Sequence, residues 1–286
     1  MRILLTGANG FLGRAVAQTL QAAGNHEVLR LVRRSTGAPQ EIVADFTQPG
    51  LARHLPSQVD AIVHAGAYVP AKEAAADLGL AMATNAEGTL RLLEYSVQAG
   101  ARRFVYVSSA AVYGSILAAG AVTETVEPQP DNPYALSKLA GELMLESFRF
   151  VHGVETVGLR FSYIYGAGMR DTSVVRKFAG LARSHAPLSL FNSGQDYFDL
   201  VHLEDAVRAV ESALRQGTGI FNIGSGKPTS VLELATTLIA VTGSASRVEK
   251  LPATGKYHSK YLDIAKAGTG LDWVPRVPLA QGLAGL

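Results

Sequence analysis

The chain has 286 residues, of which 48% are hydrophobic and 17% are charged, and it contains 29 glycines but no cysteine. This length and apolar content allow a large buried core, which excludes a disordered chain and a small disulfide-stapled scaffold. Without cysteine, disulfides, thiolate metal sites and cysteine nucleophiles are excluded as well. The 26 basic and 24 acidic residues nearly balance, so the composition indicates no nucleic-acid partner. No apolar run reaches the ~20 residues of a membrane helix, and the N-terminus lacks a signal-peptide pattern, so we expect a cytoplasmic protein without membrane contact.

The first half of the chain alternates short apolar runs with longer amphipathic ones. This pattern is typical of strands and helices wound into a parallel sheet, and it predicts an α/β fold with a doubly wound Rossmann domain. In chain order we expect strands at 2–6, 27–32, 41–44, 61–64, 104–107 and 155–159, and helices at 11–23, 80–99 and 134–152.

The alternation loosens past residue 160, which indicates a second, smaller unit. We expect a C-terminal substrate lobe formed by 161–195 and 223–286, and a dinucleotide-binding domain formed by 1–160 and 196–222. The elements expected here are helices at 172–183, 203–215 and 230–242, and strands near 188–190, 197–201 and 219–223.

Three glycines, Gly7, Gly10 and Gly13, lie between the first strand and the first helix. Glycines there allow a tight turn and a close approach of backbone N–H groups to a pyrophosphate at the helix N-terminus. The spacing is GxxGxxG, and glycines serving only as a turn and packing device would also explain it. The position after a strand and before a helix favours a dinucleotide cradle. We assign it to Gly7, Asn9, Gly10, Phe11, Leu12 and Gly13.

The end of the second strand indicates which dinucleotide is bound. A carboxylate there binds the adenosine ribose hydroxyls, whereas an arginine accommodates a 2′-phosphate. The strand ends without a carboxylate and continues into Arg33 and Arg34, so we expect NADP in preference to NAD, with Arg33 the better candidate. A solvated basic turn is the alternative. Asp45, after the third strand, can accept from the adenine amino group or serve as a turn residue, and its neighbour Phe46 is assigned to the same cofactor site.

Three side chains suggest a proton-transfer site. Tyr134 and Lys138 are four residues apart in an expected helix and share one face, and Ser108 and Ser109 end a strand at the carboxyl edge where ligands bind in such sheets. An adjacent ammonium group would stabilise the tyrosine phenolate, and a serine hydroxyl can bind the oxygen of the reacting carbon.

At this point the sequence resembles the extended short-chain dehydrogenases/reductases, the NAD-dependent epimerase/dehydratase group typified by UDP-galactose 4-epimerase. The resemblance spans nearly the whole chain in the family's order. Its motifs are TGANGFLG at 6–13, VHAGA at 63–67, NAEGT at 85–89, RFVYVSSAAVYG at 103–114, YALSK at 134–138, LRFSYIYG at 159–166, LVHLEDAV at 200–207 and FNIGSGKPTSVLELA at 221–235.

The resemblance implies three catalytic residues: Ser109, Tyr134 and Lys138. Tyr134 would be the acid/base, Lys138 would lower its pKa and hold the nicotinamide ribose, and Ser109 is favoured over Ser108 by the Ala-Ala-Val-Tyr-Gly that follows it. Tyr134 and Lys138 therefore count as cofactor-binding too. Further cofactor contacts are assigned to Ala65, Gly66, Ala67 and Asn85.

Several positions depart from the family pattern. Ala110 and Ala111 replace the Asp and Glu of the 4,6-dehydratases, which argues against elimination, and the cysteine of the epimerase-reductases is missing. Phe198 stands where nucleotide-sugar enzymes carry an arginine that clamps a diphosphate, and Tyr163 replaces an asparagine. Either other basic residues bind the substrate diphosphate, or the substrate is not a nucleotide sugar. The candidate phosphate ligands are Arg160, Arg170, Arg176 and Lys177, and the substrate contacts are assigned to Tyr68, Val69, Ser109, Tyr163 and Phe198.

The function we expect is that of a sugar epimerase or ketoreductase, which transfers hydride at a secondary alcohol or ketone of a nucleotide-linked sugar, with NADP in preference to NAD as cofactor. The alternatives are the same site acting on a free uronic acid, an aldehyde or an apolar ketone, and a non-catalytic NADP-binding sensor. We expect no metal, because His64 and His202 lack partners at ligand spacing. We expect a homodimer, as in the family; Leu92, Leu93 and Tyr95 would face the partner or pack on the sheet.

Overall fold

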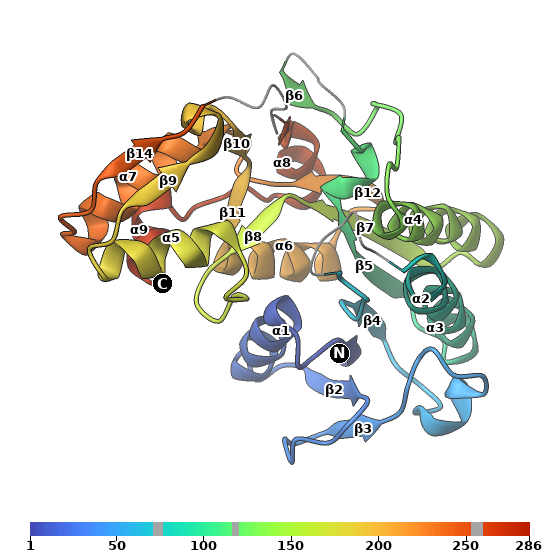
Figure 1. Cartoon of the computed structure of the whole chain (residues 1–286). Coiled ribbons are helices and arrows are strands. Elements are labelled where there is room, and N and C mark those ends of the chain that lie inside the picture. The colour runs from blue at the N-terminus through green and yellow to red at the C-terminus, as the bar shows by residue number, and fades with distance from the viewer. Residues whose placement is uncertain (71–76, 116–119, 253–259) are drawn as a thin grey trace.

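The computed structural model describes residues 1–70, 77–115, 120–252 and 260–286. Its centre is a seven-stranded sheet in which every neighbouring pair is parallel, in the order β12-β7-β5-β4-β1-β2-β3 (Figure 1). Its strands are β1 (Arg2–Thr6), β2 (Glu27–Val32), β3 (Glu41–Val43), β4 (Ala61–His64), β5 (Arg103–Ser109), β7 (Glu155–Phe161) and β12 (Gly219–Ile223).

Alternate residues of the inner strands enter cores on opposite faces of the sheet. In β1, Ile3 and Leu5 pack with α1 (Phe11–Ala22) and α6 (Leu203–Arg215), whereas Leu4 packs in the core on the other face, with α3 (Gly88–Gln98) and α4 (Pro133–His152) (Figure 1). Helices on both faces bury both sides of the strands, which is why these runs are apolar throughout. The predicted doubly wound α/β fold is confirmed.

The helix predicted at 80–99 is interrupted. The structure has α2 (Leu78–Ala81), a π-helical segment (Met82–Glu87) and then α3. Asp77 begins the series, because its side chain accepts from the N–H of Leu80 at 2.8 Å. The spacing of apolar residues does not predict this wider π-helical turn. Such π segments often lie at functional sites.

Leu92, Leu93 and Tyr95 are buried in the core between α3 and the sheet. The interpretation that they face a partner subunit is therefore wrong, and helix-to-sheet packing accounts for them.

A third core lies beside the sheet's carboxyl edge, formed by α5 (Val174–Arg183), α7 (Val231–Thr242) and α9 (Leu279–Ala284) (Figure 1). The strand predicted at 197–201 is divided, because Tyr197–Phe198 pairs with one strand and Leu200–His202 with another. The short strands are β6 (Ala121–Val122), β8 (Tyr163–Tyr165), β9 (Leu188–Leu190), β10 (Tyr197–Phe198), β11 (Leu200–His202), β13 (Thr229–Ser230), β14 (Val248–Lys250) and β15 (Tyr261–Leu262).

One part of the predicted second lobe packs elsewhere. Ala267 and Leu271 of α8 (Ala265–Leu271), with Trp273, lie in the same core as α1 and α6. The indole N–H of Trp273 donates to the carbonyl of Asp205 at 2.9 Å. The predicted lobe segment 223–286 is therefore not one packing unit, because residues 265–273 pack in the core of the first domain and Trp273 is hydrogen-bonded to α6.

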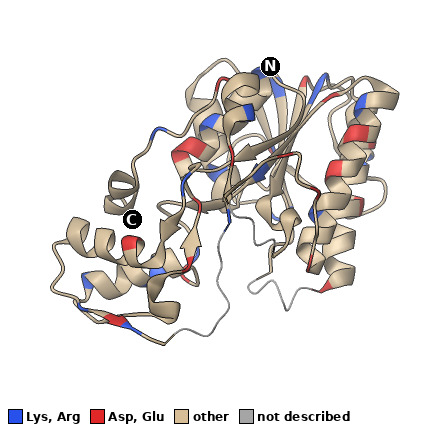
Figure 2. Ribbon diagram, turned by 90° about the horizontal axis from the view of Figure 1, so that it is seen from above, with Lys and Arg blue, Asp and Glu red and all other residues tan. Residues whose placement is uncertain are grey.

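Basic and acidic residues are scattered along both parts of the ribbon (Figure 2). Among the described residues, no helix is both long enough and apolar enough to span a bilayer.

Candidate active site

The glycine loop closes tightly against the segment that follows β4. Gly7 has φ +69°, and a Cβ there would lie 2.6 Å from the backbone of Ala65 and Gly66; a Cβ on Gly13 would overlap the carbonyl of Gly7. The N–H of Gly10 donates to that carbonyl at 2.8 Å and closes the turn. The glycines therefore act as a turn and packing device that brings the α1 N-terminus to the sheet's carboxyl edge, and their role as a dinucleotide cradle stays a prediction.

The first turn of α1 suits a pyrophosphate. Its N-cap is Gly10, which has no side chain to occupy the first N–H groups, and the described loop brings no carboxylate to them. Leu12 lies in the core between α1 and the sheet, and Phe11 packs against the third core. At these two positions a dinucleotide could therefore be contacted only by the backbone or by the edge of the Phe11 ring. The described loop thus fits a dinucleotide phosphate.

A buried chain of polar contacts runs from β1 and β4 to α3 on one face of the sheet. The N–H of Gly66 donates to Thr6 Oγ1 at 3.0 Å, and Thr6 Oγ1 lies 2.7 Å from His64 Nδ1. His64 Nε2 lies 3.0 Å from Thr89 Oγ1, which donates to the carbonyl of Asn85. Because the Thr89 hydroxyl already donates its proton to Asn85, it accepts from His64 Nε2, which therefore carries the ring proton. His64 Nδ1 then accepts from the Thr6 hydroxyl. Burial holds the pKa of His64 well below its usual range, so it is a neutral core histidine.

Asn85 joins two predicted site segments. Its Oδ1 accepts from the N–H of Tyr68 at 2.7 Å, and its Nδ2 donates to the carbonyl of Tyr68 at 3.0 Å and to Ser137 Oγ at 2.9 Å. Ser137 lies in α4 between Tyr134 and Lys138. The amide of Asn85 therefore aligns the segment after β4 with α4.

Lys138 is held near the end of β5, the strand that carries Ser109. Lys138 Nζ donates to the carbonyl of Val107 at 2.8 Å and lies 4.7 Å from the centre of the Tyr106 ring. Ser109 is two residues further along the strand, and its Oγ accepts from the N–H of Ala111 at 3.1 Å. Burial lowers the pKa of Lys138 from 10.5 to about 7. The ammonium is thus held at the strand end without a carboxylate in contact.

Tyr134 enters this edge from the first turn of α4. Asn132 caps the helix by accepting from the N–H of Ala135 at 2.9 Å, and Pro133 occupies the first helical position. Tyr134 is only 9% exposed and precedes Lys138 by one turn. The first turn of α4 is thus connected to the end of β5 through Lys138, and the joint action of Ser109, Tyr134 and Lys138 stays a prediction.

Sequence reasoning missed Glu142, one turn beyond Lys138 on α4. It accepts from Arg160 Nε at 3.0 Å and Nη2 at 2.7 Å, and from Ser108 Oγ at 2.5 Å. Arg160 Nη1 also donates to the hydroxyl of Tyr113 at 2.8 Å. Arg160 is therefore wrong as a candidate phosphate ligand, because its fork is buried and occupied. The charge of Glu142 raises the pKa of Lys138, which partly offsets burial.

The predicted adenosine side is more exposed. Arg33 and Arg34 lie in solvent after the end of β2. Asp45 Oδ1 accepts from the N–H of Thr47 at 2.9 Å and from its hydroxyl at 2.8 Å, so Asp45 forms a turn.

Phe46 packs inward. Its ring lies 5.2 Å from that of His64 in an edge arrangement, and a Cβ on Gly66 or Gly88 would collide with it. Phe46 therefore shapes the floor beneath the segment that follows β4, where Ala65 and Ala67 lie.

Tyr163 and Phe198, both predicted substrate contacts, are neighbours with ring centres 5.8 Å apart. Burial raises the pKa of Tyr163. Arg170 Nη1 donates to the carbonyl of Val69 at 3.3 Å, which brings this candidate phosphate ligand to the segment carrying Tyr68. The other two candidates, Arg176 and Lys177, line a hollow on α5.

Within the described ranges, no three His, Asp or Glu side chains gather as metal ligands would. His202 instead caps α6, since its Nδ1 accepts from the N–H of Glu204 at 3.3 Å.

Comparison with known proteins agrees with this geometry. The model of the NAD dependent epimerase/dehydratase family matches residues 3–224. The chain is 30% identical to UDP-glucose 4-epimerase of Mycolicibacterium smegmatis, covering 99% of this chain and 96% of the relative. It is 29% identical to dTDP-glucose 4,6-dehydratase of Streptomyces griseus, covering 99% and 92%. The structure of UDP-glucose 4-epimerase of Thermus thermophilus in complex with NAD superposes with a TM-score of 0.85 at 27% identity, covering 100% of this chain and 97% of that one.

The buried amine of Lys138 predicts a pH dependence of stability. Between its folded pKa of about 7 and the ordinary 10.5, the unfolded chain binds a proton that the folded chain does not, so the Lys138 contribution to stability rises with pH. We expect the free energy of unfolding of wild type minus that of Lys138→Met to increase by roughly 1–2 kcal/mol from pH 7 to pH 9, measured by urea unfolding. Lys250→Met, at an exposed position, is the control. A difference independent of pH would contradict the buried amine.

Proposed function

The chain belongs to the NAD-dependent epimerase/dehydratase family, and from that premise we propose that it transfers hydride at a secondary alcohol or ketone of a nucleotide-linked sugar. The observation that carries this proposal is the buried Lys138, held on the carbonyl of Val107 beside Ser109 and one turn from Tyr134. A cation, a phenol and a hydroxyl at the carboxyl edge of a parallel sheet can move a proton where a dinucleotide binds.

The three residues divide the proton chemistry. Tyr134 takes the proton from the substrate hydroxyl and returns it, and the ammonium of Lys138 stabilises the phenolate electrostatically. Ser109 donates a hydrogen bond to the substrate oxygen, which keeps the reacting carbon in place. A bound nicotinamide supplies the hydride acceptor and donor. The methyl groups of Ala110 and Ala111 supply no acid or base for an elimination, which favours hydride exchange without loss of water.

Removal of the Tyr134 hydroxyl tests the proposal. With UDP-glucose and dTDP-glucose among the sugars assayed, we expect Tyr134→Phe to lower kcat by ~10²–10⁴-fold, the usual contribution of a general acid/base, while affinity for the dinucleotide is retained. Tyr95→Phe removes a phenol that donates to the carbonyl of Pro56, outside the site, and is the matched control. Turnover of Tyr134→Phe close to wild type would refute the role of Tyr134.

The cofactor proposed is NADP in preference to NAD. Support comes from β2, which ends at Val32 without a carboxylate and continues into the exposed Arg33 and Arg34. A carboxylate would bind the ribose hydroxyls, whereas arginine favours a 2′-phosphate. The NAD of the Thermus thermophilus structure belongs to a relative of 27% identity.

We expect wild type to have a higher kcat/KM with NADP than with NAD. Arg33→Asp should move the ratio of the two kcat/KM values toward NAD by about tenfold or more, because the new carboxylate at the end of β2 would bind the ribose hydroxyls and repel a 2′-phosphate. A wild-type preference for NAD would contradict the proposal.

Arg170 is our proposed ligand for the substrate diphosphate. Among the four candidate cations, it is the one whose guanidinium contacts the segment carrying Tyr68 and Val69. The aromatic pair of Tyr163 and Phe198 favours a second candidate, an apolar ketone, because neither ring can bind a phosphate as an arginine fork does. Thermal stabilisation by UDP-glucose but not by uncharged ketones supports the nucleotide sugar.

We also propose that the chain forms a homodimer through α4. Leu136, Leu143 and Phe150 are 43%, 62% and 91% exposed and seven residues apart, so they lie along one face of the helix. The same face on a second copy would bury this apolar row by two-fold symmetry.

Sedimentation velocity tests the dimer. We expect wild type to sediment as a dimer at micromolar concentration and Leu143→Lys to weaken association by tenfold or more, because the new charge would be buried at the interface. Val274→Lys, at a position 51% exposed outside α4, should leave the mass unchanged. A monomeric wild type would contradict the dimer.

A further inference from the structure

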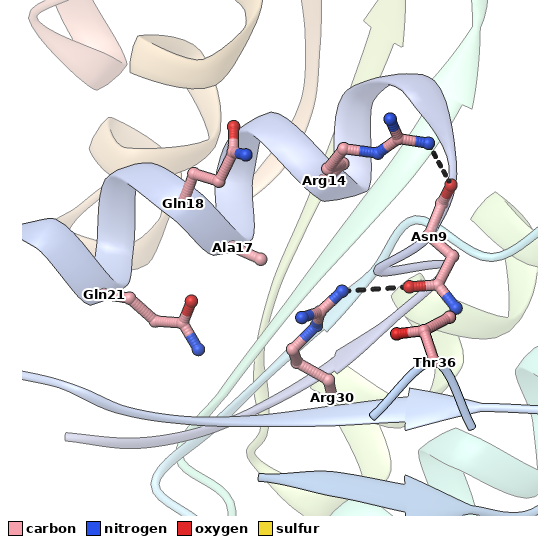
Figure 3. Close-up of a pocket in the computed structure, with 7 residues that line it drawn as sticks. All are labelled: Asn9, Arg14, Ala17, Gln18, Gln21, Arg30 and Thr36. Carbon is pink, nitrogen blue, oxygen red and sulfur yellow. Dashed lines mark hydrogen bonds between the residues drawn. The ribbon is translucent and has the colours of Figure 1, made fainter. Parts of the chain in front are cut away.

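A hollow of about 330 Å³ lies between α1 and the β2 side of the sheet, beside the glycine loop. Asn9, Arg14, Arg30 and Thr36 are among its lining residues, and none of the described residues that line it is acidic (Figure 3). Two positive charges therefore face one cavity at the loop where the dinucleotide phosphates are expected.

Both guanidinium groups converge on a single residue. Arg30 Nη2 donates to Asn9 Oδ1 at 2.9 Å, and Arg14 Nη2 donates to the carbonyl of Asn9 at 3.3 Å (Figure 3). Arg30 Nε is buried and has no hydrogen-bond partner among the residues that the structure describes. A buried, charged N–H without an acceptor is costly, so Arg30 has a donor available for a ligand.

Glu41 is paired in register with Arg30 between β2 and β3. Its oxygens accept from the hydroxyl of Ser35 at 2.7 Å, and from the N–H of Thr36 at 2.8 Å and its hydroxyl at 2.5 Å. These bonds hold the pKa of Glu41 at about 2, and the charge of Arg30 contributes to lowering the pKa of this carboxyl. The carboxylate of Glu41 is thus hydrogen-bonded to Ser35 and to Thr36, which lines the hollow, whereas the guanidinium of Arg30 donates to Asn9.

We propose that this hollow binds the 2′-phosphate of NADP, with Arg30 as its principal ligand and Arg14 as the second. The inference rests on the proposed NADP preference and names residues that sequence reasoning passed over in favour of Arg33 and Arg34. A dianion beside two guanidinium groups satisfies Arg30 Nε and balances both charges, and the planar fork of arginine suits phosphate oxygens.

Two nucleotides that differ only by the phosphate test the site without turnover. Adenosine 2′,5′-bisphosphate and adenosine 5′-monophosphate are titrated calorimetrically into wild type, Arg30→Gln, Arg14→Gln, Arg33→Gln and the exposed control Arg102→Gln. We expect wild type to prefer the bisphosphate and Arg30→Gln to lose tenfold or more of that affinity, with the monophosphate unchanged. Arg14→Gln should lose less, and Arg30→Lys should recover part of the loss by restoring charge.

The outcomes separate the inference from the proposals beneath it. If Arg30→Gln keeps the bisphosphate preference while Arg33→Gln loses it, the phosphate lies outside the hollow and this inference is overturned, although the NADP preference stands. If wild type binds both nucleotides equally, the NADP preference fails and the inference with it. If wild type binds neither nucleotide, the proposed function itself fails.

Discussion

The buried ammonium of Lys138 is the constraint on which the site depends. Removing this cation from water is unfavourable, and the chain offsets the cost with the Val107 carbonyl, the Tyr106 ring and the charge of Glu142 one turn away. Since Val107 and Tyr106 belong to β5, the same contacts fix α4 over the end of that strand. Because Tyr134 lies one turn before Lys138 in the same helix, fixing α4 also fixes the position of Tyr134.

A second set of interactions connects this helix to the glycine loop. The chain of contacts runs from Thr6 through His64 and Thr89 to Asn85, and from Asn85 to Ser137 in α4. All five residues are buried, so each bond is worth more than it would be in water, and a break would leave an unsatisfied group. The two halves of the proposed site are therefore positioned by one polar path along the face of the sheet that α3 and α4 cover, with a neutral histidine at its centre.

The arginines show why residue type alone does not assign a role. Arg160 was a candidate for phosphate binding, but Glu142 occupies its fork in a buried pair, and breaking such a pair typically costs about 3–5 kcal/mol. Arg30 looked like an ordinary strand residue, yet its Nε is buried without an acceptor in a hollow shared with Arg14. Each assignment depends on partners distant in sequence, which neither periodicity nor spacing contains.

The sequence by itself determined the doubly wound sheet, the glycine turn, and the places of Ser109 at a strand end and of Tyr134 and Lys138 on one helix, because all of these follow from local signals: apolar period, glycine spacing and the carboxyl end of a strand. Only the tertiary structure decided the π segment before α3, the hydrogen bond of Trp273 to α6 and the Glu142–Arg160 pair. Those features arise from contacts between segments brought together by folding, where burial and the available partner decide which side chain is occupied and which is left for a ligand.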